Sequence, residues 1–428
     1  MKQKHHNTNE NLKQLTSETL IVGVDAAKNN HVARAVDYRG AELSKTLTFS
    51  SNSKGFLMFH KFIRDLAAIH DKTNVIVGLE PTGVYGNTLV QFLRGKGINV
   101  VLVLGSQVAI AKELDDNTPS KNDYKDALTI CKLIQGGRFR KFREFDENIN
   151  ALKEAMSLNQ QLTKNLTRVK CQIDNWLCLY FPEFQLAFKD WTKKTAYATL
   201  KICPLPKDVL AVKPEGLVQM WRKSGVIKGI GIKKADELRH LARYSTGVTT
   251  APEFAAIHIR DLLIQYEVFL SQSDELWALI DTLVKDIPLY KTLSGIPHLG
   301  KRAICGIISE IGDPFVFSHP RQLIRLAGLS LRESSSGSRR GTSQITKRGR
   351  PHLRHWLYIA VLNLLKEKEP SFWALHLYYT KRKDNPLKKM QSVIALCCKL
   401  LRVIYGMCMH GTAYDPRLVT PYLASNTV

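Results

Sequence analysis

The sequence has few acidic side chains for its length, no closely spaced cysteine pairs and no long uninterrupted apolar run. Its 428 residues include 38 Asp and Glu against 62 Lys and Arg, a formal net charge of +24. Such an excess favours a polyanionic partner, and nucleic acid is the first candidate. The shares of hydrophobic residues (44%) and charged residues (23%) exclude global disorder. The length predicts about two to four domains.

None of the eight cysteines belongs to a Cys-x-x-Cys pair, so we expect reduced thiols in a cytosolic protein and no zinc site. The first nineteen residues are polar and lack the apolar segment of a signal peptide. The most apolar late stretch, Val393–Met409, is interrupted by Lys399 and Arg402. We therefore predict no membrane span and a soluble, cytoplasmic protein.

Residues 19–145 carry the pattern of an α/β domain. Apolar runs predict strands at Leu20–Val24, His31–Asp37, Leu43–Phe49, Asn74–Leu79 and Asn99–Leu104. Apolar spacing predicts helices at Phe56–Ile69 and about residues 82–95, and Asp37–Gly40 predicts a hairpin turn. Three strands that look antiparallel, followed by alternating helices and strands, are the chain order of a ribonuclease H-like domain.

The middle region, residues 146–290, is expected to consist of long helices. Ile149–Trp176 and Pro252–Ile287 both have apolar residues at spacings of three and four. Such helices pair within one chain or across a dimer, and simple bundle packing explains the pattern as well as a dimerising coil does. Between them, residues 181–251 form an insert without clear periodicity. Residues 1–18 have the composition of a disordered polar tail.

Residues 291–428 form an α-rich, basic region, so the predicted fold class is α/β plus mostly α. Residues 321–402 hold eighteen Lys and Arg and four Asp and Glu, a density suited to phosphate contacts. The region opens with Gly295–Ala303, which resembles a helix-hairpin-helix turn and includes Lys301 and Arg302 as candidate phosphate contacts. Gly225–Ala235 resembles the same turn, with a plain helix–helix connection as the alternative.

Four carboxylates stand out by position. Asp25 ends the first predicted strand and Glu80 ends the fourth, while Asp123 and Asp126 are three residues apart and share one face of a helix. Carboxylates at neighbouring strand ends, faced by a pair on a helix, suit Mg²⁺ or Mn²⁺ because hard cations prefer oxygen ligands. Considered one at a time, these residues have ordinary structural interpretations: Asp25 as a turn residue at the end of a strand, and Asp123 as the N-cap of a helix.

A serine cluster lies in the basic region, at Ser334-Ser335-Ser336-Gly337-Ser338, ahead of the cationic segment Ile345–Arg354. Alone, the cluster has the composition of a flexible linker. Beside so many cations, a hydroxyl in this loop is well placed to meet a DNA phosphate.

In this order the motifs resemble the DEDD-type insertion-sequence transposases, a family related to the Piv DNA invertase that includes bridge-RNA-guided recombinases. Val22–Lys28 (VGVDAAK), Gly78–Gly86 (GLEPTGVYG) and Lys121–Ala127 (KNDYKDA) are similar to the family's RuvC-like domain. SGIPHLGKRAICGIISEIGD, AGLSLRESSSG and ITKRGRPHLR are similar to its C-terminal transposase domain. The sequence departs from the family pattern at Leu331, where a proline is usual.

The resemblance implies that Asp25, Glu80, Asp123 and Asp126 bind Mg²⁺ or Mn²⁺. It implies that Ser336 is the nucleophile, with Ser334 and Ser335 as neighbouring hydroxyls. The serine would attack a DNA phosphate, form a phosphoserine link and release a 3′-hydroxyl. Residues expected to contact nucleic acid are Arg339, Arg340, Lys347, Arg348, Arg350 and Arg354, together with Lys301 and Arg302.

The implied partners are donor and target DNA and a structured bridge RNA, bound by a homodimer or tetramer at the bacterial nucleoid. Two other hypotheses stay open. One is a metal-dependent junction endonuclease with water as its nucleophile, which forms no covalent protein–DNA adduct. The other is a non-enzymatic nucleic-acid-binding protein. Loss of recombination with retained binding in Asp25→Ala would argue against this last hypothesis.

Overall fold

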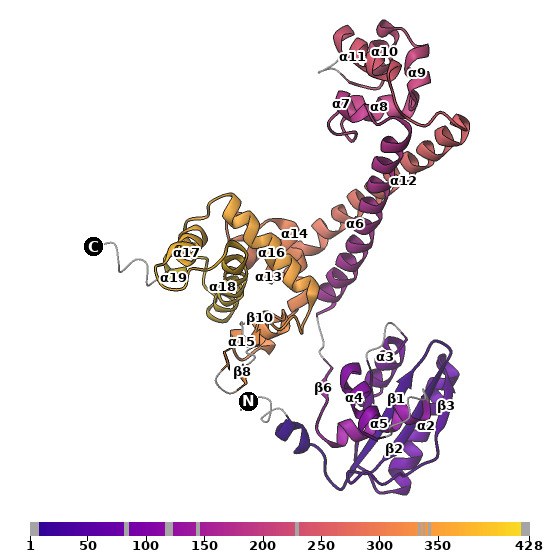
Figure 1. Cartoon of the computed structure of the whole chain (residues 1–428). Helices are drawn as coiled ribbons and strands as arrows, with labels where there is room; N and C mark the ends of the chain where they lie inside the picture. Colours follow the sequence, from indigo (N-terminus) through magenta and orange to yellow (C-terminus); the bar gives the residue numbers. More distant parts are fainter. Residues whose placement is uncertain are drawn as a thin grey trace. The chain divides into compact units, whose positions relative to one another are not determined.

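The computed structural model describes residues 8–80, 85–115, 123–142, 146–226, 231–332, 335–336, 339–340 and 344–420. The chain divides into two compact units, residues 1–144 and 145–428, and each is described by itself. The first unit holds a mixed β-sheet, and the second is helical apart from short strands (Figure 1).

The first unit is built on a six-stranded sheet with the order β3-β2-β1-β4-β5-β6. Its strands are β1 Thr19–Ala26, β2 Asn30–Val36, β3 Leu47–Ser50, β4 Asn74–Leu79, β5 Asn99–Leu102 and β6 Arg140–Lys141. The first three strands pair antiparallel, whereas β4 is parallel to β1 and β5 is parallel to β4. This arrangement is consistent with the ribonuclease H-like order expected from the sequence.

The third strand is shorter than predicted because the chain first makes a tight turn. Oδ1 of Asp37 accepts hydrogen bonds from the backbone N–H groups of Arg39 (2.9 Å) and Ala41 (2.8 Å). After the turn, the N–H of Leu43 donates to the carbonyl of Ala35 (3.0 Å). Regular pairing with β2 begins only at Leu47. The predicted hairpin turn is present, and the strand predicted from Leu43 starts four residues later.

The two faces of the sheet pack against different helices. The helices that pack against the sheet are α2 Ser53–Ile69, α3 Asn87–Gly95, α4 Gly105–Asp115 and α5 Asp123–Gln135. Val22 and Val24 of β1 face a core that includes α2 and α3, and Ile21 faces one that includes α4 and α5. Because side chains alternate along a strand, Gly23 and Asp25 lie on the face of Ile21. The face that carries Asp25 is therefore the one covered by α4 and α5.

Helix α5 lies directly on the sheet because two strand positions are glycine. A Cβ atom at Gly23 of β1 would overlap the carbonyl oxygen of Ala127, and one at Gly78 of β4 would overlap the side chain of Ile134. Glycine within a strand marks this kind of close backbone approach. The Cys131 thiol donates to the carbonyl of Arg34 in β2 (3.4 Å), and burial raises its pKa to about 12, so it stays protonated.

The N-terminal segment packs on the end of α5 from Thr8 onward, which differs from the disordered tail predicted up to residue 18. The Asn11 amide donates hydrogen bonds to the carbonyls of Gly137 (3.0 Å) and Phe139 (2.9 Å), and Leu15 packs against the α4–α5 core. These carbonyls belong to the segment that follows α5, so the polar side chain of Asn11 ties the N-terminal segment to it.

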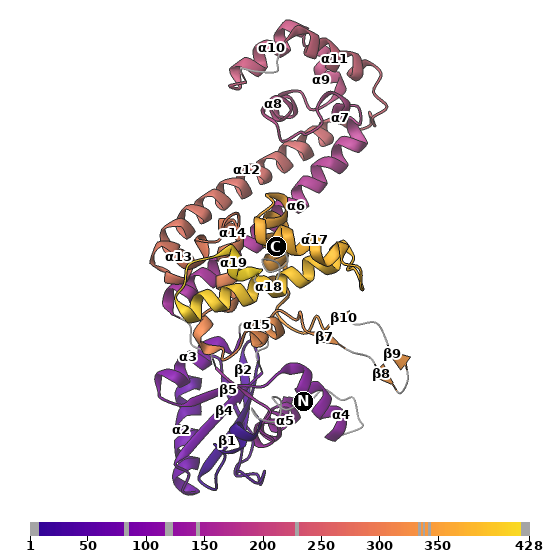
Figure 2. The same cartoon turned by 90° about the vertical axis from the view of Figure 1, so that its left-hand side faces the viewer.

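Two long helices, α6 Glu147–Tyr180 and α12 Pro252–Leu283, form the frame of the second unit. They run side by side in both views (Figures 1 and 2), as the predicted long helices suggested. Between them, Oδ1 of the buried Asn159 accepts a hydrogen bond from the indole N–H of Trp277 (2.9 Å). Any slip of one helix would leave both buried groups unpaired, so this pair fixes their register.

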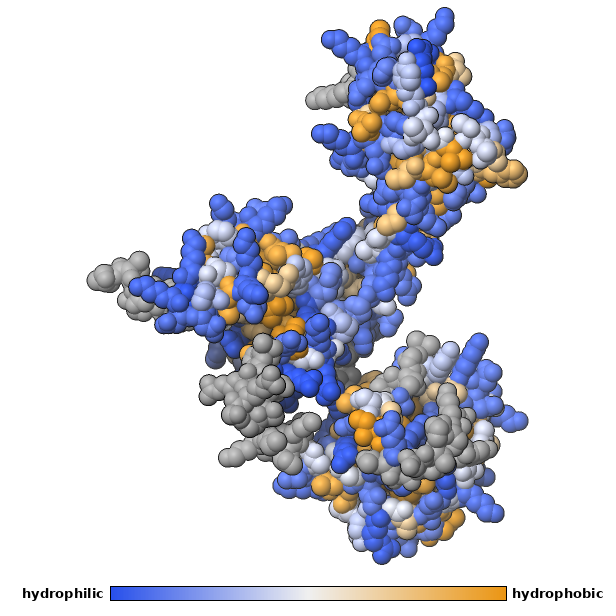
Figure 3. All heavy atoms as spheres, in the orientation of Figure 1, coloured by the Kyte–Doolittle hydropathy of each residue, from blue (hydrophilic) through white to orange (hydrophobic). Residues whose placement is uncertain are grey.

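The insert folds as a group of short helices at one end of the α6–α12 pair. They are α7 Phe184–Ala187, α8 Lys194–Ile202, α9 Pro206–Ala211, α10 Pro214–Lys223 and α11 Ile232–Arg243. Their core joins Trp221 to Trp176 of α6 and Tyr266 of α12. In Figure 3, hydrophobic side chains gather on the visible face of this end. Leu186 of α7 and Phe254 of α12 are among the exposed hydrophobic residues of these helices. Residues 227–230 of the predicted Gly225–Ala235 turn lie outside the described part.

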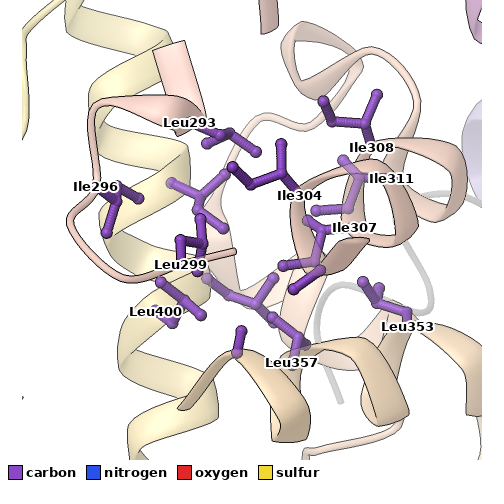
Figure 4. Packing of buried hydrophobic residues seen from close by; sticks show 14 of the residues in the cluster. Leu293, Ile296, Leu299, Ile304, Ile307, Ile308, Ile311, Leu353, Leu357 and Leu400 are labelled. Carbon is purple, nitrogen blue, oxygen red and sulfur yellow. The ribbon is translucent and has the colours of Figure 1, made fainter. Parts of the chain in front are cut away.

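The remaining elements pack around the other end of the α6–α12 pair. They are η1 Val284–Asp286, α13 Pro288–Ser294, α14 Lys301–Ile311, η2 Pro314–Val316, α15 Pro320–Leu326, β7 Leu331–Arg332, β8 Ser335–Ser336, β9 Arg339–Arg340, β10 Gln344–Ile345, α16 Pro351–Lys366, α17 Pro370–Lys381, α18 Lys389–His410 and α19 Pro416–Val419. Figure 4 shows Ile304, Ile307 and Ile311 of α14 beside Leu357 of α16 and Leu400 of α18.

Helix α18 is long and apolar enough, by length and composition alone, to cross a membrane, and 44% of its most apolar 18-residue stretch is buried within the protein. Leu396, Leu400, Leu401 and Ile404 have no exposed surface and belong to the core of this region. Its apolar side chains therefore serve the packing of α16 and α17 around it.

His31 makes the stability of the first unit depend on pH. Its ring is fully buried between those of Phe49 (5.2 Å) and Phe56 (5.9 Å), and among the described residues neither ring nitrogen has a hydrogen-bond partner. Burial lowers the pKa of His31. As the pH falls below about 6.5, His31 becomes protonated in the unfolded chain but stays neutral in the folded chain. The free energy of unfolding therefore decreases with falling pH until the lower pKa of the folded state is reached.

We expect His31→Phe to weaken this pH dependence and to raise stability by about 1 kcal/mol at neutral pH, because a buried unpaired polar group is removed. Thermal unfolding of both proteins at pH 5 and pH 7.5 measures the effect. His60 and His376, whose pKa values are also lowered by burial, are common to both proteins. Equal pH slopes in the two proteins would refute the assignment to His31.

Candidate active site

Asp25 and Glu80 lie at the same edge of the sheet, at the carboxyl ends of two neighbouring parallel strands. Val24 of β1 is in register with Leu79 of β4, and the two carboxylates are the next residues along each chain. Val24 and Leu79 both face the α2–α3 core, so alternation directs Asp25 and Glu80 to the α4–α5 face. Both residues are half-buried. Open α/β sheets bind ligands at this end of their parallel strands.

The carboxylate of Glu80 lies against the first residue of α4. A Cβ atom at Gly105 would overlap Oε1 of Glu80, so the carboxylate occupies the space that a side chain would need. The first turn of a helix carries N–H groups without intrahelical partners and favours negative charge nearby. The start of α4 thus suits the carboxylate of Glu80.

Helix α5 brings Asp126 to the same face. Asp123 is its first residue, and the Asp123 side chain lies outside the described part of the chain. Asp126, one turn further along, is 9% exposed. The next residue, Ala127, touches Gly23 of β1, two residues before Asp25. Carboxylates from β1, β4 and α5 therefore share one face of the sheet near one edge.

A lysine neutralises Asp126. The Nζ of Lys112, from α4, forms an ion pair with Oδ1 of Asp126, and the two side chains are 35% and 12% exposed. Where side chains are described, no group of three or more His, Cys, Asp or Glu is arranged to hold a metal ion. The donors are nevertheless all carboxylate oxygens, which suit a hard divalent cation. The set therefore fits such a cation in chemistry, provided that Lys112 leaves Asp126.

The serine segment forms a small two-stranded ladder. Ser335 of β8 pairs with Arg340 of β9, and Ser336 pairs with Arg339, while β7 and β10 pair Leu331 with Ile345. The side chains of the serines and of these two arginines lie outside the described part. The backbone places Ser335 opposite Arg340 and Ser336 opposite Arg339, whereas Ser334 lies outside the described residues.

Two of the predicted nucleic-acid contacts have partners within the protein. Arg350 is paired with the Glu310 carboxylate (3.5 Å), and its guanidinium also donates to a backbone carbonyl of α14 (2.5 Å). Arg354 donates to the carbonyl of Ala327 (2.8 Å), next to the turn at Gly328. Lys347 and Arg348, by contrast, are exposed. Arg350 thus ties the start of α16 to α14, and Arg354 ties α16 to the segment that leads into the serine strands.

Lys301 and Arg302 begin α14, and residues 295–300 join this helix to α13 in the stretch that resembles a helix-hairpin-helix turn. Both cations lie over the indole of Trp277, at 5.5 Å and 5.1 Å from the ring centroid, and Lys301 pairs with Asp281. These contacts fasten the start of α14 to α12.

Sequence reasoning missed Lys112 and Gly105. Neither belongs to a recognisable motif, because each acts through a neighbour that is distant in sequence. A glycine three residues after the end of β5, at the start of a helical segment, was the available hint for Gly105. Lys112 carried no comparable signal, since lysines are frequent throughout this chain.

Residues 22–182 match a family model described as transposase, and residues 290–377 match one described as transposase of the IS116/IS110/IS902 family. The uncharacterized 43.6 kDa protein of insertion element IS110 from Streptomyces coelicolor is 21% identical over 402 residues, 93% of this chain and 96% of that protein. The pilin gene-inverting protein of Moraxella bovis is 27% identical over 176 residues, 40% of this chain and 53% of that protein.

These matches, on a sheet domain with carboxylates at one edge and a basic helical region, define a DNA-recombining enzyme of the transposase class. The chain belongs to the IS116/IS110/IS902 family of insertion-sequence transposases, which the two models cover in order. The uncharacterized 44.8 kDa protein of insertion element IS116 from Streptomyces clavuligerus is also similar, with 22% identity over 410 residues, 94% of this chain and 96% of that protein.

We expect Gly105→Ala to lower recombination by on the order of 100-fold, because the new methyl group pushes the Glu80 carboxylate from its place and small misplacements are costly in catalysis. The free energy of unfolding of the Gly105→Ala variant should change by less than about 1 kcal/mol, because only the end of the flexible Glu80 side chain must move. Gly95→Ala is the matched control, because a Cβ atom there meets no atom within 4 Å. A strand-transfer assay and thermal unfolding would measure both. Full activity in Gly105→Ala would contradict the placement of Glu80.

Proposed function

We propose that this transposase cuts and rejoins DNA through a covalent link between Ser336 and a DNA phosphate, assisted by a divalent cation at Asp25, Glu80, Asp123 and Asp126. The observation that carries the proposal is the gathering of carboxylates from β1, β4 and α5 on one face of the sheet. In the same proposal, the sheet unit is a RuvC-like ribonuclease H domain, supported by its strand order.

The serine chemistry conserves the energy of the phosphodiester. Oγ of Ser336 forms a bond to phosphorus as the bond from phosphorus to the 3′-oxygen breaks, and the departing oxygen takes up a proton to become a 3′-hydroxyl. Attack by a different 3′-hydroxyl reverses the step and restores the serine. When bound, Mg²⁺ or Mn²⁺ would neutralise charge on the phosphate and favour ionisation of the attacking hydroxyl.

The second unit would hold the nucleic acid. Arg339 and Arg340 are opposite the serines in the β8–β9 ladder, and Lys347 and Arg348 are exposed just beyond it. A cationic segment of this kind would neutralise phosphates around the nucleophile. We further propose a structured bridge RNA as guide, because the chain resembles the bridge-RNA-guided recombinases and its net charge of +24 suits a polyanionic partner. A homodimer or tetramer at the bacterial nucleoid, in the cytoplasm, completes the proposal.

The test is a search for a denaturant-resistant protein–DNA adduct. Purified protein, its RNA and labelled donor and target DNA are incubated with Mg²⁺ and resolved on a denaturing gel. We expect an adduct that disappears in Ser336→Ala, persists in Ser334→Ala and Ser335→Ala, and falls at least 100-fold in Asp25→Ala and Asp126→Ala. DNA binding should remain in all five variants, since none removes a cation.

Cleavage without an adduct, unchanged by Ser336→Ala, would replace this mechanism with that of a metal-dependent junction endonuclease that uses water. Loss of the adduct in Ser334→Ala or Ser335→Ala instead would move the nucleophile along the cluster. Both outcomes are read on the same gel, so one experiment separates the mechanisms.

A further inference from the structure

Helix α4 touches two of the four candidate metal-binding carboxylates. Its first residue, Gly105, accommodates the Glu80 carboxylate, and two turns later Lys112 forms the ion pair with Asp126. Helix α5, which carries Asp126, packs against α4. One helix therefore holds carboxylates that come from β4 and from α5.

The Lys112–Asp126 pair stands where a cation would bind. The Asp126 side chain is only 12% exposed, so leaving it without a counter-charge would be unfavourable. An ammonium at contact distance uses the same carboxylate oxygen that a hard cation needs as a ligand. Lys112 and a divalent cation consequently compete for Asp126.

Lys112 can leave without disturbing α4. Its side chain is 35% exposed and ends a flexible four-carbon stem, so a small rotation returns the ammonium to water. The buried contact of α4 is made by Val108, one turn earlier. Exchange of Lys112 for a divalent cation therefore needs no repacking of the core.

We propose that Lys112 is a positioning residue that occupies Asp126 in the cation-free protein and is displaced when a divalent cation binds. The lysine keeps the carboxylate oriented and neutralised. It also lowers the apparent affinity for the cation, because only molecules in which the ion pair is open can bind one. This inference rests on the proposed metal site, because it concerns the order of events at that site.

The experiment is a titration of full-length protein with Mn²⁺, with free Mn²⁺ read by electron paramagnetic resonance. Lys112→Met should bind Mn²⁺ about two- to fivefold more tightly than the wild type, the gain expected from removing one partly exposed ion pair. Lys112→Arg retains the competing charge and should stay close to the wild type. Lys61→Met, on α2 at the opposite face of the sheet, controls for the loss of one positive charge.

Asp126→Asn tests whether the effect passes through the pair. In this background Lys112→Met should leave Mn²⁺ affinity unchanged, because the lysine no longer has a carboxylate to cover. The rise in melting temperature on adding sub-saturating Mn²⁺ gives a second readout, larger in Lys112→Met than in the wild type. Circular dichroism without metal establishes that each variant is folded.

Equal or weaker Mn²⁺ binding in folded Lys112→Met, with wild-type binding still lost in Asp25→Asn, would overturn the role of Lys112 and leave the metal site standing. An equal gain in Lys61→Met would also overturn it, by reducing the effect to net charge. Wild-type protein that binds no Mn²⁺, or binds it equally in Asp25→Asn, would overturn the metal site and this inference together.

Discussion

The contact between α5 and the central strand β1 at Gly23 is the constraint on which the candidate site depends. The carbonyl oxygen of Ala127 occupies the position of a missing Cβ atom, so the helix backbone rests on the strand itself. With a larger residue at Gly23, α5 would have to shift, and Asp126 would move away from the strand edge that carries Asp25 and Glu80. Gly78 lets the same helix approach the sheet at Ile134, and the Asn11 amide holds the segment that follows the helix.

Once α5 and α4 are in place, electrostatics governs the rest. Carboxylates gathered on one partly buried face repel each other and need positive charge nearby. Lys112 supplies positive charge to Asp126, and the N-terminus of α4 provides a favourable environment for the Glu80 carboxylate. In the site proposed above, a lysine at this position would still leave room for a cation, because a partly exposed lysine can move away while a buried apolar side chain cannot.

In the second unit, several of the cationic side chains serve packing. Arg350, Arg354, Lys301 and Arg302 have partners inside the protein, among them Glu310 and Trp277, that fix α14 and α16 relative to their neighbours. The sequence alone could not distinguish these internally paired residues from exposed ones such as Lys347 and Arg348. Net charge indicates the class of partner, whereas local contacts decide which side chains remain exposed to bind it.

The sequence by itself determined the order of strands and helices, the two long helices and the four carboxylates at strand and helix ends, because apolar periodicity and local turn chemistry act over a few residues. It did not determine that residues 8–18 pack on α5, that the third strand starts at Leu47, or that Lys112 covers Asp126. Those features join residues distant in the chain, and only tertiary packing, with its demand that buried groups be paired and backbones approach closely, could decide them.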